Sequence, residues 1–201
     1  MSNTFDRLKS IVGTYVGSRT VDEITSGQGN FPHREIQSIC CATYLQGFDA
    51  LCLSADSREI ERVLDGYYAR ISEAVLETDG DLNEFAGGMT LSFYRPGQIS
   101  SDQRTLVTRI VSVLDKAAAT FENSHGVWVG VGFCTGRLVY GRYGSSNRAT
   151  VTGFGPPRIC ATRLARRGSG INLCERLAEI CNWAGASTSI SVHARAADAQ
   201  G

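Results

Sequence analysis

The chain has 201 residues, of which 42% are hydrophobic and 20% charged, with a formal net charge of zero. This is the composition of a globular protein, with enough apolar side chains for one sizeable core. No stretch approaches the roughly 20 apolar residues of a membrane helix, and the N-terminus lacks the basic and apolar blocks of a signal peptide. We therefore expect a cytoplasmic protein without a membrane partner.

The cysteines and the distribution of charge indicate which kinds of binding site to expect. There are seven cysteines and no CxxC pair, which favours buried free thiols over a zinc site. From Arg137 onward the chain has nine arginines against three acidic residues, so residues 1–136 carry the opposite charge. Two interpretations stay open: solvated faces that happen to differ, or an anion site or dimer contact. Aromatic residues do not alternate with the basic ones, so we do not expect DNA binding.

The hydrophobic periodicity predicts alternating strands and helices. We expect an N-terminal helix and linker over residues 1–33, and one α+β domain over residues 34–201. The predicted strands are residues 36–44, 82–86, 89–94, 127–134, 137–143 and 187–193, and the predicted helices are 5–16, 57–77, 101–121, 157–166 and 174–182. A turn at Thr135-Gly136 is expected to join two of these strands. This order predicts a mainly antiparallel sheet with helices on one face.

Four segments in this order resemble the class III adenylyl/guanylyl cyclase catalytic domain, over about residues 36–180. They are Ala42–Leu51 with its Gly47-Phe48, Val63–Gly88 with its Gly87-Gly88 hairpin, Val129–Gly141 with its Thr135-Gly136, and Gly155–Leu164 followed by Ile171–Glu175. The resemblance implies a ferredoxin-like, palm-type fold for residues 34–201. It also implies a site built between two subunits, which joins the 3′ hydroxyl of a nucleotide to its α-phosphate with two metal ions.

The resemblance places the two metal-binding aspartates of the family at Tyr44 and Gly88, or at Thr43 if the register shifts by one. None of these residues is a carboxylate, which Mg²⁺ prefers. Asp49 and Asp81 lie nearby but outside the matching positions. We therefore expect no metal site and no cofactor, with Mg²⁺ or Mn²⁺ only where a partner subunit supplies carboxylates.

The resemblance also assigns a helix that carries an asparagine for ribose and, four residues later, an arginine for the transition state. These positions hold Ile159 and Arg163, so Arg163 is the catalytic candidate. A second register would use Asn172 and Arg176, but it needs an insertion of about thirteen residues; the gapless register is preferred. Cys134, where the family often has histidine, is interpreted as a packing residue at a turn.

The base-selecting position of the family holds Glu84, which favours guanine or is simply a strand residue facing solvent. The expected nucleotide-binding residues are Glu84, Arg158, Arg163, Arg166 and Arg167. Our first hypothesis is a non-catalytic regulatory module that forms a homodimer and keeps a groove for a purine nucleotide. The alternative is an enzyme, the metal-less half of a heterodimeric cyclase. A third possibility is a polymerase-palm relative of the diguanylate cyclase type.

Overall fold

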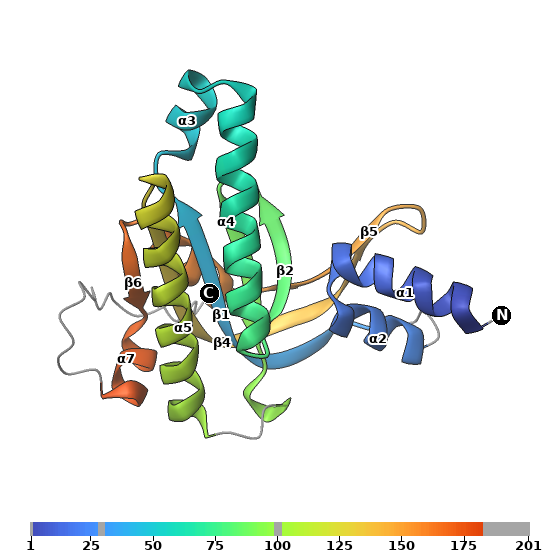
Figure 1. The fold of residues 1–201 in the computed structure, drawn as a ribbon. Helices are drawn as coiled ribbons and strands as arrows, with labels where there is room; N and C mark the ends of the chain where they lie inside the picture. The colour runs from blue at the N-terminus through green and yellow to red at the C-terminus, as the bar shows by residue number, and fades with distance from the viewer. Residues whose placement is uncertain (1, 28–30, 99–101, 183–201) are drawn as a thin grey trace.

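The structure, a computed structural model, describes residues 2–27, 31–98 and 102–182. In this part of the chain the helices are α1 (Ser2–Val16), α2 (Ser18–Ser26), α3 (Phe48–Ser54), α4 (Ser57–Glu77), α5 (Gln103–His125), α6 (Pro156–Ala165) and α7 (Glu175–Cys181). The strands are β1 (Arg34–Leu45), β2 (Asp81–Ala86), β3 (Met89–Tyr94), β4 (Val129–Gly144), β5 (Ala149–Phe154) and β6 (Gly170–Leu173). They form one sheet in the order β2-β3-β1-β4-β5, with β6 also paired to β4 (Figure 1). Only the β4–β6 pair is parallel, so the predicted α+β fold with a mainly antiparallel sheet is confirmed.

The two long helices, α4 and α5, pack side by side on one face of the sheet. Each begins at an aspartate whose carboxylate accepts backbone N–H groups of the first turn, Asp56 in α4 and Asp102 in α5. Their apolar stripes bury residues such as Tyr67, whose hydroxyl lies 2.5 Å from Thr43 Oγ1 of β1. Burial of one large apolar side chain stabilises a fold by about 1.5–3 kcal/mol, so this layer is the main core.

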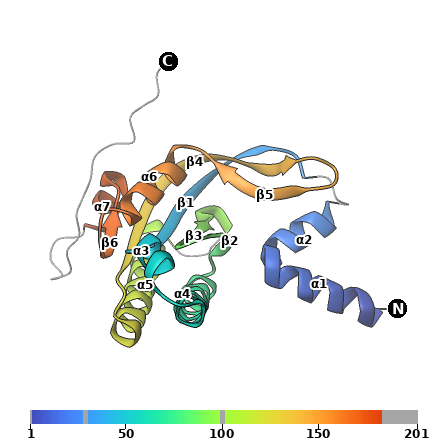
Figure 2. The same cartoon turned by 90° about the horizontal axis from the view of Figure 1, so that it is seen from above.

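The shorter helix α6 lies on the opposite face, across β1 and β4 (Figure 2). The contact is close because β4 has glycine where the helix crosses it. A Cβ atom at Gly132 would lie 2.1 Å from the carbonyl oxygen of Ala161, and one at Gly130 would lie 2.0 Å from that of Ala165. Only glycine permits such an approach of helix backbone to strand. The helices therefore do not all cover one face, and α6 forms a layer of its own.

The predicted turn at Thr135-Gly136 is wrong. Residues 129–144 form one long strand, and its pairing with β1 runs on without a break through Ser38↔Gly136. The Thr135 hydroxyl donates to the Ser38 carbonyl oxygen at 3.2 Å, and Pro157 of α6 packs over Gly136. Cys134 accordingly lies inside a strand and is buried, rather than facing a turn. Strand β5, which the periodicity did not reveal, forms the hairpin with the end of β4.

The N-terminal segment contains two helices where one was predicted. The second, α2, is attached to the sheet by Glu23, whose carboxylate pairs with Arg95 beyond β3 and with Arg34 of β1. Helix α1 packs against α2 and projects away from the sheet (Figures 1 and 2). None of the described helices combines the length and hydropathy needed to cross a bilayer. The strand predicted at residues 187–193 lies outside the described residues.

Candidate functional site

The site that the resemblance implies lies at the end of the sheet where β1 stops and the β2–β3 hairpin turns. Tyr44 is the next-to-last residue of β1, and Gly88 lies in the hairpin beside it. The N–H of Leu45 donates to the carbonyl oxygen of Gly88 at 2.7 Å. The structure therefore places the two expected metal positions next to each other.

The side chains of Phe48 and Arg166 lie against the two expected metal positions. A Cβ atom at Gly88 would lie 2.6 Å from Cβ of Phe48, which begins α3. Any side chain at position 88, including an aspartate, would have to displace that phenylalanine. On the other side, the guanidinium carbon of Arg166 lies 5.1 Å from the ring centre of Tyr44, a cation–π distance.

The donor set at this place does not fit a divalent metal ion. It offers a phenol, a glycine and an aromatic ring, together with a fixed positive charge that repels a cation. In the part of the chain that the structure describes, no cluster of three or more His, Cys, Asp or Glu side chains suits a metal. We therefore derive no reaction step through a metal held by this chain.

The carboxylates of Asp49 and Asp81 do not replace the missing metal ligands. Asp49 lies in the first turn of α3 and is exposed. Asp81 is at the far end of β2, five residues from Ala86, which is roughly 16 Å of strand. It is buried, and its carboxylate lies 3.5 Å from both the Arg95 guanidinium and the Tyr140 hydroxyl. Burial raises the pKa of Asp81, and the arginine offsets part of that rise.

Two of the expected nucleotide-binding residues form an ion pair with each other. Arg158, in the first turns of α6, donates to the Glu84 carboxylate of β2 at 2.6 Å. It also donates to Thr152 Oγ1 at 3.1 Å and to the Gly153 carbonyl oxygen at 3.3 Å, and lies over the Phe154 ring. Glu84 is therefore not the solvent-facing strand residue considered above, and a ligand that uses it has to replace Arg158.

The other three arginines gather at the opposite end of α6. Arg163 lies in the last turn of α6, and Arg166 and Arg167 come directly after the helix ends. All three side chains are exposed. Arg158 and Arg166 are eight residues apart, about 12 Å along a helix. The five expected residues thus form two groups, an ion pair of Glu84 and Arg158 and a set of three exposed arginines, of which Arg166 lies over Tyr44.

The alternative register for the asparagine and arginine is wrong. Asn172 lies in β6, buried, and its side-chain amide donates to the Gly170 carbonyl oxygen at 3.2 Å. Arg176 lies in α7, so the two residues do not share a helix face. In the gapless register Ile159 and Arg163 lie one turn apart on the exposed side of α6.

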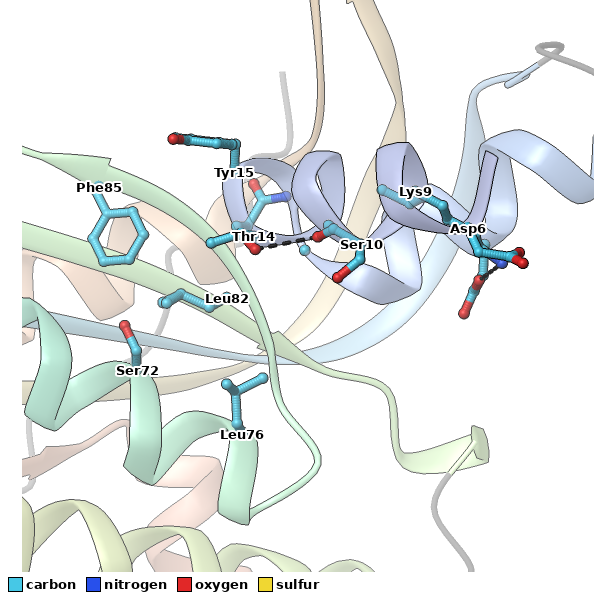
Figure 3. Close-up of a pocket in the computed structure, with 14 residues that line it drawn as sticks. Asp6, Lys9, Ser10, Thr14, Tyr15, Ser72, Leu76, Leu82 and Phe85 are labelled. Carbon is cyan, nitrogen blue, oxygen red and sulfur yellow. Dashed lines mark hydrogen bonds and ion pairs between the residues drawn. The ribbon is translucent and has the colours of Figure 1, made fainter. Parts of the chain in front are cut away.

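Two sizeable open cavities lie elsewhere, on either side of α1. One of about 670 Å³ lies between α1, α4 and β2, and Figure 3 shows Tyr15 and Thr14 of α1 across it from Ser72, Leu82 and Phe85. Another of about 750 Å³ lies between the N-terminal helices and β5. Neither cavity is lined by the arginines of α6. The α6 side is the better candidate site, because the exposed positive charge and the positions matched by the resemblance coincide there.

Phe48 and the Glu84–Arg158 pair were not recognised in these roles from the sequence. The sequence shows Phe48 as part of a Gly-Phe motif, but its position against Gly88 follows from the start of α3, a seven-residue helix without a clear periodic pattern. Glu84 and Arg158 are 74 residues apart, and no local pattern links them. The one signal in the sequence is that both residues are among the expected nucleotide-binding residues.

Comparison with known proteins identifies the fold. No protein-family model matches the sequence, and no curated protein matches it. Solved structures do: a bacterial light-regulated adenylyl cyclase has a TM-score of 0.74 at 15% identity over 89% of this chain and 56% of its own. An adenylyl cyclase from P. aeruginosa has a TM-score of 0.66 at 16% identity, covering 75% of this chain and 83% of its own. A guanylyl cyclase has a TM-score of 0.60 at 18% identity, covering 74% and 80%.

The light-regulated enzyme is matched over more of this chain than the other two. This chain spans only about half the length of that enzyme. At these identities the likeness establishes the architecture alone. The chain has the fold of the class III adenylyl and guanylyl cyclase catalytic domains.

Proposed function

We propose that this chain is a cyclase-fold module that forms no cyclic nucleotide by itself and acts as a nucleotide-binding, dimerising regulatory unit. One observation carries the proposal: the two expected metal positions, which lie side by side, hold Tyr44 and Gly88 rather than carboxylates, and the Arg166 guanidinium lies over Tyr44. Two-metal chemistry needs carboxylates at these two places. A phenol, a glycine and a guanidinium at these places do not suit a divalent metal ion, although the surrounding fold is that of the cyclases.

A phosphate-bearing ligand fits the positive end of α6. Arg163, Arg166 and Arg167 are exposed and form charge-assisted hydrogen bonds with phosphate in the geometry that guanidinium groups favour. Arginines in this place also stabilise the carboxyl end of the helix through its dipole, which is a purely structural role. Glu84 is the base-reading candidate, and its use by a purine requires opening of the Arg158 pair.

A homodimer is the second part of the proposal. Three apolar side chains on neighbouring elements are exposed: Val139 of β4, Phe154 of β5 and Ile159 of α6. Val139 and Phe154 are direct cross-strand partners, so together with Ile159 they mark an apolar area that association would cover. Structural neighbours from Blastocladiella emersonii include both a dimeric and a monomeric guanylyl cyclase domain, so the fold supports either state.

Light scattering tests the dimer. At tens of micromolar we expect twice the chain mass of 21.7 kDa, and a monomer mass refutes this part of the proposal. Ile159→Glu is expected to shift the protein toward monomer, since it places a charge in the apolar area. Leu76→Glu, at an equally exposed position of α4 on the other side of the sheet, is the matched control and is expected to leave the mass unchanged.

The alternative function, the metal-less half of a heterodimeric cyclase, rests on Arg163. This residue is exposed, stands at the family's arginine position and is free of the Glu84–Arg158 network. A partner of the same fold that holds both aspartates would bring Mg²⁺ or Mn²⁺ and receive this arginine at its site.

A turnover assay separates the two functions. The chain alone, given ATP, GTP, CTP or UTP with Mg²⁺ or Mn²⁺, is expected to yield no cyclic product. Turnover by the isolated chain that Arg163→Ala abolishes would overturn the proposal. Turnover that appears only with a cyclase-fold partner, and is lost with Arg163→Ala, would establish the heterodimer.

A further inference from the structure

Helix α1 presents its apolar side away from its own domain. Its exposed apolar residues recur at helical spacing and form one stripe: Leu8, Ile11, Val12, Tyr15 and Val16. The exposed fractions of these side chains run from 39% for Val12 to 83% for Tyr15. Such a stripe normally faces the core of the domain that carries the helix.

The side of α1 that faces α4 and β2 has a different composition. Across the cavity of about 670 Å³, α1 contributes mostly polar residues and glycine: Asp6, Lys9, Ser10, Gly13 and Thr14. Of the apolar stripe, Tyr15 alone also lines this cavity, as Figure 3 shows. The domain therefore lies beside the polar side of α1 and leaves the apolar stripe open.

Ion pairs hold the two N-terminal helices in place. Glu23 of α2 pairs with Arg95 and with Arg34 of the domain, and Lys9 of α1 pairs with Asp22 of α2 at 2.6 Å. These contacts fix the position of the helices, but the exposed fractions above show that the stripe stays uncovered.

The two helices do not enclose a core by themselves. A small open cavity of about 160 Å³ remains between them and is lined mainly by apolar residues: Leu8, Lys9, Val12, Val21, Ile24 and Thr25. Pairs of antiparallel helices bury such a groove when two pairs associate into a four-helix arrangement. The groove between α1 and α2 thus has the form of half a helical bundle.

The charges of the two helices suit association with a second copy of the same pair. Helix α1 has one acidic and two basic residues, a net charge of +1, whereas α2 has one basic and two acidic residues, a net charge of −1. A two-fold contact uses the same patch on both subunits, so the patch has to be self-complementary. A copy whose α1 lies next to this α2 meets that requirement.

The stripe also continues the apolar area of the proposed homodimer. The ring of Tyr143 packs edge-on against Phe154, with 4.8 Å between the ring centres. Tyr143 in turn lines the cavity of about 750 Å³ that Tyr15 and Val16 of α1 border. The exposed area on β4 and β5 and the stripe on α1 are therefore neighbours, and one partner can cover both.

We propose that α1 and α2 form a dimerisation arm, in which the apolar stripe of α1 packs against the same stripe of a second copy of this chain. The choice of a second copy rests on the proposed function, through the continuity with the homodimer area, and on the charges of the arm. The stripe is centred between Leu8 and Tyr15, so an antiparallel crossing of the two α1 helices brings Ile11 close to the partner's Ile11.

Cysteine cross-linking of the full chain tests the arm. In a Cys52→Ser background, Ile11→Cys is expected to give a disulfide-linked dimer under mild oxidation with copper phenanthroline, and peptide mapping is expected to find the link at position 11 of both chains. Ser10→Cys, on the polar side of α1, is the matched control and is expected to give no such link. Equal links at both positions, or none at position 11, would overturn the proposal.

A charge in the stripe provides a second test. Val12→Glu, added to the Ile11→Cys chain, is expected to abolish the link because it places a carboxylate in the apolar contact. Thr14→Glu adds the same charge on the polar side of α1 and is expected to leave the link intact. Retention of the link with Val12→Glu would contradict packing through the stripe.

Light scattering on the same samples separates this inference from the homodimer proposal. A dimer mass without the link at position 11 refutes the arm and leaves the homodimer in place. A monomer mass without the link refutes both. A dimer mass and a link that both survive Ile159→Glu support the arm and refute the contact at Ile159.

Discussion

Replacing Gly132 with alanine adds one methyl group inside the contact between α6 and β4. That carbon would lie 2.1 Å from the carbonyl oxygen of Ala161 and 2.5 Å from the backbone nitrogen of Ala165. These are backbone atoms of a helix, so no side chain can rotate away and the helix itself must move. Such overpacking costs typically 1–3 kcal/mol, and we expect about 3 kcal/mol here.

Thermal unfolding measures this cost. For a domain of this size about 1 kcal/mol corresponds to roughly 2–4 °C, so Gly132→Ala is expected to lower Tm by roughly 6–12 °C. The control is Gly168→Ala, also next to α6, where a Cβ atom meets nothing within 4 Å and the effect is expected to stay within about 1 kcal/mol. A Gly132→Ala protein with the Tm of this control would refute the seating of α6 on the sheet, and with it the positions of the α6 arginines.

Three more predictions concern buried charge, the ion pair and the filled metal position. Because burial raises the folded-state pKa of Asp81 above its unfolded value, the stability it contributes is complete below the unfolded pKa and is lost as pH rises through the folded pKa. The free energy of unfolding of Asp81→Asn, measured with urea at pH 4 and pH 7, should therefore rise relative to that of the unmodified chain as pH rises. A relative fall would contradict this sign. A double-mutant cycle of Glu84→Ala and Arg158→Ala should give a coupling of about 1 kcal/mol, discounted for partial exposure; zero coupling would mean that the pair does not form in solution. Gly88→Asp alone should destabilise the fold, and Phe48→Ala should relieve part of that cost in the double variant, whereas simple additivity would show that Phe48 does not fill the site.

The long amphipathic helices and the β2–β3 hairpin could be predicted because their signals are local. The periodic stripe of residues 57–77 coincides with α4, and Gly87-Gly88 marks the hairpin turn. The continuity of β4 through Thr135-Gly136 could not be predicted in this way. It depends on pairing with β1 and on Pro157 packing over Gly136, both of which are tertiary contacts.

The same distinction between local signals and tertiary contacts applies to the candidate site. The proximity of Tyr44 and Gly88 follows from strand pairing and was predicted through the resemblance. The filling of that space by Phe48 depends on the direction in which α3 leaves β1, which no periodicity encodes.

In the proposed function this cyclase fold binds a nucleotide through arginines, without a metal. Titration calorimetry with GTP, with and without Mg²⁺ and at two salt concentrations, tests it most directly. We predict an affinity that is indifferent to Mg²⁺, weakens with salt, and falls by roughly one to two orders of magnitude with Arg163→Ala, since loss of a charged hydrogen bond costs about 1.5–3 kcal/mol. Binding that requires Mg²⁺ would contradict the claim and direct attention to Asp49 and Asp81 as metal ligands.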